Sequence, residues 1–161
     1  IGRVQLKRLP EFIEARKQNW ESLRRGLAGH EDVLEFALPS HATAWDHDRG
    51  FSWDKTGCRT DCSWFGFKIA VKPGSAFSRT ELAQELDRNL IGNRMLFGGN
   101  LLRQPAFAEL WKERPHALRV IGKLEGADEI MNNTLFLGTY PGATKKMLDF
   151  QINVIKAFAT Q

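Results

Sequence analysis

Residues 94–105 read Arg-Met-Leu-Phe-Gly-Gly-Asn-Leu-Leu-Arg-Gln-Pro and gather side chains suited to binding hydroxyl and phosphate groups. The two glycines allow the backbone to approach a ligand closely. Asn100, Arg103 and Gln104 then supply planar hydrogen-bonding groups, and a guanidinium binds a carboxylate or phosphate through two parallel bonds. The same residues also fit a surface turn with a solvated arginine, and composition alone favours that turn.

A second group of reactive side chains lies in residues 40–62, a long connection that we expect to be irregular. His41, His47, Cys58 and Cys62 are ligand types that tetrahedral zinc accepts. However, His-x5-His followed by Cys-x3-Cys has neither the usual order nor the tight Cys-x2-Cys spacing of zinc sites. The pattern therefore favours a solvated loop with two reduced thiols over a metal site or a disulfide.

Other classes of function lack support in the sequence. There is no phosphate-binding glycine loop, dinucleotide fingerprint, zinc-protease motif or nucleophile elbow. The net charge of +4 is scattered along the chain, which argues against nucleic-acid binding. No apolar run is long enough to span a membrane. Two cysteines and no secretory signal predict a cytoplasmic protein.

Helices are expected where apolar residues recur at spacings of three and four. Such a stripe runs from Phe12 to Leu27. Pro10 fits the first turn of a new helix, so we expect two helical pieces in this opening stretch. Ser78 and Glu81 form a capping-box pattern, which predicts a helix that begins beside them.

The remaining elements alternate in type and define the fold class. We predict strands at residues 33–38, 64–71, 91–97 and 135–137, and further helices at residues 105–111, at 127–133 and after residue 142. This order predicts one α+β domain, with a small, mostly antiparallel sheet and helices on one face. Trp64, Phe65 and Phe67 fit either a stacking platform for a nucleobase or the core of a central strand, and the strand pattern favours the core.

Five segments, residues 9–16, 63–67, 97–105, 128–134 and 138–142, follow one another as in a known enzyme family. Together they resemble the C-terminal part of the CDP-4-dehydro-6-deoxyglucose 3-dehydrases of lipopolysaccharide biosynthesis. These enzymes belong to the sugar-nucleotide aminotransferase group, which has the aspartate-aminotransferase fold. The Gly-Asn-Leu-x-Arg-Gln-Pro segment is the most specific, because ordinary sugar aminotransferases in the group carry a His-containing version of it.

The resemblance implies that residues 1–161 are the small C-terminal domain of a longer enzyme, with the large cofactor-binding domain upstream. The start on Ile1 without a methionine agrees with this interpretation. The implied reaction removes the C3 hydroxyl of a CDP-linked 6-deoxyhexulose, using pyridoxamine or pyridoxal phosphate. A [2Fe–2S] cluster, an iron–sulfur flavin reductase and a homodimer are implied for the full-length enzyme. This domain is expected to hold no cofactor and no catalytic base.

The resemblance leaves this domain the role of closing over the substrate. We expect the sugar-nucleotide side of the cleft to be lined by Arg94, Asn100, Arg103 and Gln104, with Phe97 and Tyr140 as secondary candidates. Residues 40–62 form an insertion longer than the family usually has, and Cys62 stands where a proline is expected. The two cysteines are therefore not assigned to an iron–sulfur cluster.

Two other interpretations remain open. The first is a pyridoxal-phosphate sugar aminotransferase, which would carry a lysine upstream where the dehydrases carry a histidine. The second is a stand-alone, non-catalytic binding module, which would have a start codon just before Ile1.

Overall fold

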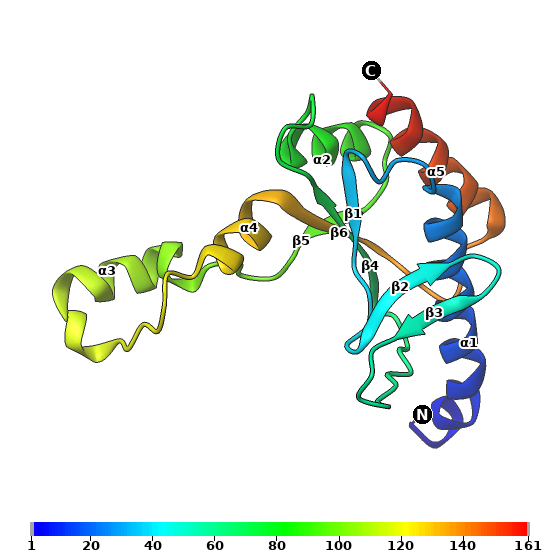
Figure 1. The fold of residues 1–161 in the computed structure, drawn as a ribbon, viewed down its shortest axis with the longest axis horizontal. Coiled ribbons are helices and arrows are strands. Elements are labelled where there is room, and N and C mark those ends of the chain that lie inside the picture. The colour runs from blue at the N-terminus through cyan, green and yellow to red at the C-terminus, as the bar shows by residue number, and fades with distance from the viewer. Residues whose placement is uncertain (1, 161) are drawn as a thin grey trace.

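The computed structural model describes residues 2–160, so Ile1 and the expectation attached to it lie outside the described residues, as does Gln161. The centre of the domain is a four-stranded sheet in the order β1-β4-β6-β5 (Figure 1). Each pair of neighbouring strands is antiparallel. The strands are β1 (Leu34–Phe36), β4 (Gly66–Val71), β5 (Asn93–Met95) and β6 (Thr134–Gly138). The predicted α+β class with an antiparallel sheet is confirmed.

Three helices cover one face of this sheet: α1 (Gly2–Gly26), α2 (Arg79–Arg88) and α5 (Lys145–Ala159). Alternation along β4 explains the choice of face, because Phe67 and Ile69 are fully buried while Lys68 between them is only partly covered. The helices contribute Leu23, Leu86 and Ile155, each completely buried, to the same core. Burial of these side chains supplies the main stabilisation of the domain.

Helix α1 is one continuous helix, so the prediction of two helical pieces was wrong. Pro10 lies inside it and cannot donate the backbone bond that a helix interior expects, which costs about 3 kcal/mol. The helix continues past Pro10 and is held further along by Asn19, Trp20 and Leu23, which are buried. Tertiary packing of its second half therefore outweighs the local signal for a helix start.

Residues 40–62 are not irregular throughout, which corrects the prediction for this segment. They contain an antiparallel hairpin of β2 (Ala42–Asp46) and β3 (Gly50–Trp53). Asp46 forms the turn by accepting bonds from the backbone N–H groups of Asp48 and Arg49, both at 3.0 Å. The hairpin is anchored to the core by Trp45, whose ring meets that of Trp20 edge-on at 5.7 Å.

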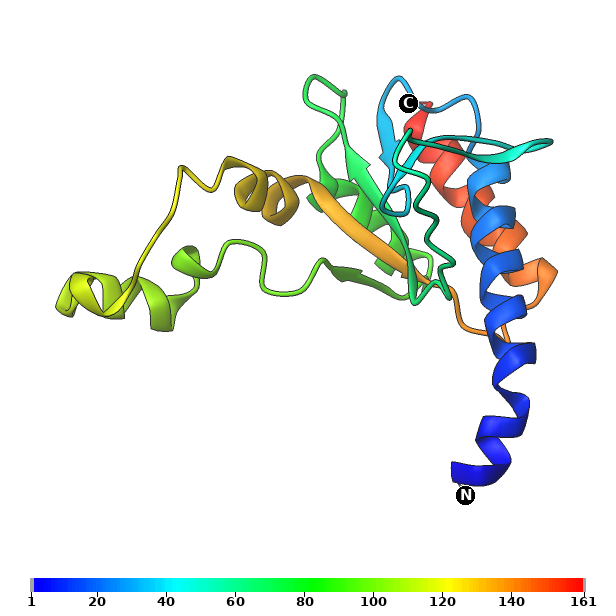
Figure 2. The ribbon, with the colours of Figure 1, turned by 60° about the horizontal axis from the view of Figure 1, so that its bottom comes forward.

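Residues 101–123 extend away from the body of the domain, as both views show (Figures 1 and 2). They contain the 3-10 helix η1 (Leu101–Arg103), α3 (Pro105–Glu113) and the 3-10 helix η2 (Pro115–Ala117). Helix α4 (Glu125–Asn133) then returns the chain to β6. No residue of α3 is buried.

Within residues 2–160, the helices are too short or too polar to cross a membrane.

The predicted helix at the capping box is confirmed as α2. The Ser78 side chain accepts a bond from the Glu81 backbone N–H, and the Glu81 carboxylate accepts one from the Ser78 backbone N–H. Arg79, in the first turn of α2, donates to the backbone oxygens of Asn132 and Met131, both at 3.1 Å. Because these carbonyls lie at the C-terminal end of α4, Arg79 fixes α4 relative to α2.

The sheet core yields a stability prediction. Leu135 in β6 is completely buried, so Leu135→Ala is expected to destabilise the domain by about 2–5 kcal/mol through lost burial and a residual cavity. The matched control Leu6→Ala, at a leucine that is 68% exposed, is expected to change stability by less than about 0.5 kcal/mol. Chemical denaturation measures both variants. Equal losses of unfolding free energy in the two variants would contradict the placement of Leu135 in the core.

Candidate functional site

The backbone of residues 96–100 has a shape that only a few residue types tolerate. Phe97 and Gly99 both have positive φ angles, 52° and 58°. A Cβ atom on Gly99 would lie 2.6 Å from the Cβ of Met131 in α4. Gly99 is therefore required for this loop to lie against α4. The close approach explains why the predicted binding loop contains a glycine at this position.

Asn100 links this loop to α4. Its side chain is buried, with 5% exposure, and its Nδ2 donates to Asp128 Oδ1 at 2.7 Å. Its Oδ1 accepts from the Leu102 backbone N–H at 3.1 Å and so caps η1. Both ends of the amide are used inside the protein, so Asn100 positions its neighbours.

Arg103 binds the same carboxylate. Its Nη2 donates to Asp128 Oδ2 at 2.7 Å and its Nε donates to Asp128 Oδ1, a two-pronged ion pair. The Arg103 side chain is still 59% exposed, whereas that of Asp128 is 25% exposed. One edge of the guanidinium is thus held by the protein, and Nη1 has no hydrogen-bond partner among residues 2–160.

The electrostatics of this cluster are set by Asp128. The Arg103 guanidinium, with help from the Asn100 amide, lowers the pKa of the Asp128 carboxyl to about 2. The carboxylate is therefore charged at neutral pH and balances the arginine charge. Gln104 completes the loop, because its Nε2 donates to the Gly98 oxygen at 2.8 Å. Asn100, Arg103, Gln104 and Asp128 form what we call the Asp128 cluster.

Arg94 and Phe97 lie elsewhere, on the sheet side of the loop. Arg94 in β5 and Lys68 in β4 both pair directly with Phe136 of β6, so the three side chains share the face opposite the core. Phe97 is 77% exposed, and its ring centroid lies 6.4 Å from that of Phe65 and 6.3 Å from that of Phe136. The sheet therefore presents two cations beside three aromatic rings.

Phe65 departs from the core interpretation of its segment. Phe67 is fully buried, as the strand pattern predicts, but Phe65 is 62% exposed because it precedes β4 and points to the open side. A Cβ atom on Gly66 would lie 2.5 Å from the Phe136 ring, so this glycine lets the ring lie against the backbone. The three rings of Phe65, Phe97 and Phe136 form an open aromatic patch.

Tyr140 lies beside α1 and is not grouped with the other predicted residues. Its side chain is 67% exposed and lines a cavity of about 560 Å³ with Arg8 and Arg16. The backbone of Tyr140 is held by α1, because the buried Asn19 side chain donates a hydrogen bond to the Tyr140 backbone oxygen at 2.7 Å. Of the six predicted residues, three belong to the Asp128 cluster, Phe97 belongs to the aromatic patch, Arg94 lies beside that patch on the sheet, and Tyr140 stands apart. Their contact with substrate stays a prediction.

The zinc alternative at His41, His47, Cys58 and Cys62 finds no geometric support. Within residues 2–160, the one group of three possible metal ligands is Asp46, His47 and Asp48, which includes neither cysteine. His41 lies 3.1 Å from Asp54. The two cysteines are free thiols.

Sequence reasoning did not single out Asp128 as a site residue. It belongs to the 128–134 segment, where nothing in the local pattern separates it from the neighbouring Glu129. Its importance comes from a contact across 25 positions with Arg103. The available signal was the presence of an arginine-containing loop followed along the chain by a short amphipathic helix. That order does not specify which residue of the helix pairs with the arginine.

This geometry can be compared with known proteins. Residues 1–158 match the DegT/DnrJ/EryC1/StrS aminotransferase family, and the chain belongs to that family. The family expected from the sequence segments is therefore confirmed.

Among its relatives, the chain is 40% identical over 157 residues to the lipopolysaccharide biosynthesis protein RfbH of Salmonella typhimurium, covering 98% of this chain and 31% of the relative. It is 32% identical to a dTDP-4-dehydro-2,6-dideoxy-D-glucose 3-dehydratase of Saccharopolyspora spinosa, covering 98% and 29%. The E. coli GDP-4-keto-6-deoxy-D-mannose-3-dehydratase with bound hydrated PLP superposes with a TM-score of 0.72 at 25% identity, covering 96% and 33%. The chain thus spans about a third of the length of these proteins.

The Asp128 contact predicts a pH dependence. The folded-state pKa of about 2 lies below the usual value of about 3.9, so the contact stabilises the fold above about pH 4 and is lost as pH falls towards 2. Asp128→Asn is therefore expected to lower the melting temperature at neutral pH, and the difference from wild type should vanish in acid. The control is Glu129→Gln, at an exposed carboxylate on the same helix. A difference that persists unchanged to pH 2 would contradict this role.

Proposed function

We propose that this chain is the substrate-covering small domain of a nucleotide-sugar 3-dehydratase that removes the C3 hydroxyl of a 4-keto-6-deoxy sugar. The observation that carries the proposal is the Asp128 cluster, in which a carboxylate holds Arg103 by one edge and leaves Nη1 available for a ligand. The 3-dehydratase names of the relatives support the reaction class. A CDP-linked substrate follows from the resemblance of the sequence segments.

The cofactor belongs to the part of the enzyme beyond this chain. Pyridoxamine or pyridoxal phosphate requires a phosphate cradle and a base or lysine beside its ring. The arginines near the loop do not surround a phosphate in this way, because Arg79 donates to backbone oxygens and Arg103 keeps only Nη1 free of its pair with Asp128. The residues of this chain therefore do not fit the cofactor, and no step of the reaction is assigned to them.

The proposed role of the domain is to bind, orient and enclose. Arg103 donates through its free edge to a phosphate or a sugar hydroxyl, and Arg94 adds a second cation at the sheet. Phe97 brings an exposed ring to the sheet face that carries Arg94. Closing such a surface over the substrate excludes water and strengthens these electrostatic contacts. Gln104 and Asn100 serve this role by keeping the loop rigid.

The complete enzyme is proposed to work in the cytoplasm as a homodimer. Loss of the C3 hydroxyl as water followed by reduction to a CH₂ group consumes two electrons, so a reductant is required. An iron–sulfur flavin reductase, with a [2Fe–2S] cluster in the dehydratase, is the proposed source. None of the residues of this chain is assigned to that cluster.

The first test concerns Arg103. In the full-length enzyme, Arg103→Ala is expected to lose about 1–3 kcal/mol of substrate binding, because a charge-assisted bond is no longer made. This loss corresponds to roughly 5- to 150-fold weaker binding of the nucleotide sugar, measured by calorimetry.

Two controls separate binding from folding. Arg88→Ala removes an exposed arginine of α2 and is expected to leave affinity unchanged. Asp128→Asn leaves the Arg103 side chain in place but removes the carboxylate that holds it. This variant is expected to weaken binding of the nucleotide sugar less than Arg103→Ala does. Equal affinity of Arg103→Ala and wild type would refute the assignment of Arg103.

A second test separates the dehydratase from the aminotransferase. If the full-length protein is a dehydratase, the residue beside the cofactor ring is a histidine, and added pyridoxal phosphate forms no covalent bond with the protein. Absorbance spectroscopy and borohydride treatment are then expected to show a freely exchangeable cofactor. A cofactor reduced irreversibly onto a lysine would establish the aminotransferase instead.

A further inference from the structure

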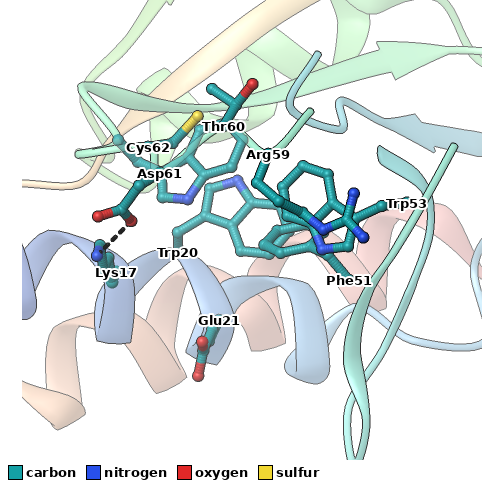
Figure 3. A pocket seen from close by; sticks show the side chains of 10 residues that line it. Lys17, Trp20, Glu21, Phe51, Trp53, Arg59, Thr60, Asp61 and Cys62 are labelled. Atoms are coloured by element: carbon teal, nitrogen blue, oxygen red, sulfur yellow. Dashed lines mark ion pairs between the residues drawn. The ribbon is translucent and has the colours of Figure 1, made fainter. Parts of the chain in front are cut away.

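The hairpin in residues 42–53 and the segment that follows it build a pocket over α1 (Figure 3). The volume of the pocket is about 340 Å³, near the lower end for small-molecule sites. Its aromatic lining comes from Trp20, Phe51, Trp53 and Trp64. None of these residues belongs to the Asp128 cluster or the aromatic patch. The size fits one ring with its substituents.

The aromatic walls are held in place by contacts with one another. Trp20 is buried, with 1% exposure, and its ring stacks on that of Trp64 at 4.7 Å with an angle of 11° between the planes. Phe51 lies 5.5 Å from Trp20 and 5.7 Å from Trp53, measured between ring centroids. Such mutual packing leaves few rotamers, so the pocket is formed before any ligand arrives.

The rim of the pocket carries balanced charge. Lys17 in α1 pairs with Asp61 at 2.5 Å, and Arg59 lies 5.2 Å from the Trp53 ring. Glu21 adds a second carboxylate to the lining. Burial raises the pKa of the Cys62 thiol, which therefore stays neutral and adds no charge. With two cations and two carboxylates, the rim offers a phosphate no excess positive charge.

We propose that this pocket binds a single neutral sugar ring. A pyranose has one face of C–H groups, which carry partial positive charge and stack on the electron-rich faces of aromatic rings. Its hydroxyls both donate and accept, which suits a lining that contains donors such as Arg59 and acceptors such as Asp61. A nucleotide, with two or more negative charges, lacks a matching cationic cluster here.

This inference does not depend on the proposed function. It concerns saccharide binding at the hairpin, whereas the proposed reaction is tested at Arg103. Pyranoside binding at the hairpin pocket and the role of Arg103 are tested with different variants. Either proposal can therefore be refuted while the other stands.

Saturation-transfer NMR on the full-length protein tests the proposal, with a methyl 6-deoxyhexopyranoside as probe and cytidine monophosphate as the charged comparison. We expect saturable transfer to the ring protons of the pyranoside, with little change when ionic strength rises, because the ligand is neutral. Trp53→Ala is expected to weaken this binding at least about tenfold. The control Trp111→Ala, in α3 and outside the pocket, is expected to leave it unchanged.

A second variant guards against loss of folding in Trp53→Ala. Arg59 is exposed, so Arg59→Ala is expected to keep the fold and weaken pyranoside binding several-fold. Three results would overturn the proposal: no saturable transfer to the pyranoside, salt-sensitive binding of cytidine monophosphate that Trp53→Ala abolishes, or equal pyranoside binding by wild type and both pocket variants.

Discussion

The pairing of β4 with β6 places two different surfaces back to back, and the rest of the domain depends on it. Alternate side chains along these strands point to opposite faces of the sheet. One set, which includes Phe67, Ile69 and Leu135, faces α1, α2 and α5 and forms the core. The other set includes Lys68 and Phe136 and faces away from these helices. A shift of one residue in this register would exchange the two surfaces, so burial of the core also fixes the surface offered to a substrate.

A second level of order comes from polar contacts that join distant segments. Asp128 holds Asn100 and Arg103, while Arg79 holds the other end of α4 through backbone oxygens. Helix α4 is therefore fixed at both ends although none of its residues is fully buried. Charge-assisted hydrogen bonds replace apolar burial at the base of an extended arm, which keeps the binding loop in one position without a core of its own.

The hairpin of residues 42–53 adds a third feature. Its Trp45 and Phe51 complete an aromatic cluster around Trp20 of α1, and Arg24 lies between the rings of Phe36 and Trp45, at 4.5 and 5.2 Å. Phe51 and Trp20 also line the pocket proposed to bind a sugar ring, whereas Trp45 does not. Attachment and proposed recognition thus share Phe51 and Trp20, and Trp45 serves attachment alone.

The sequence by itself determined the elements with strong local signals: the capping box of α2, the alternation of β4 and the family-specific loop that contains Asn100 and Arg103. It did not reveal that α1 runs through Pro10, because packing of Trp20 and Leu23 outweighs a local cost. It also missed the hairpin and the role of Asp128. Only the tertiary structure decided these, since a carboxylate 25 positions from its arginine and a tryptophan cluster drawn from three segments are contacts that no local pattern encodes.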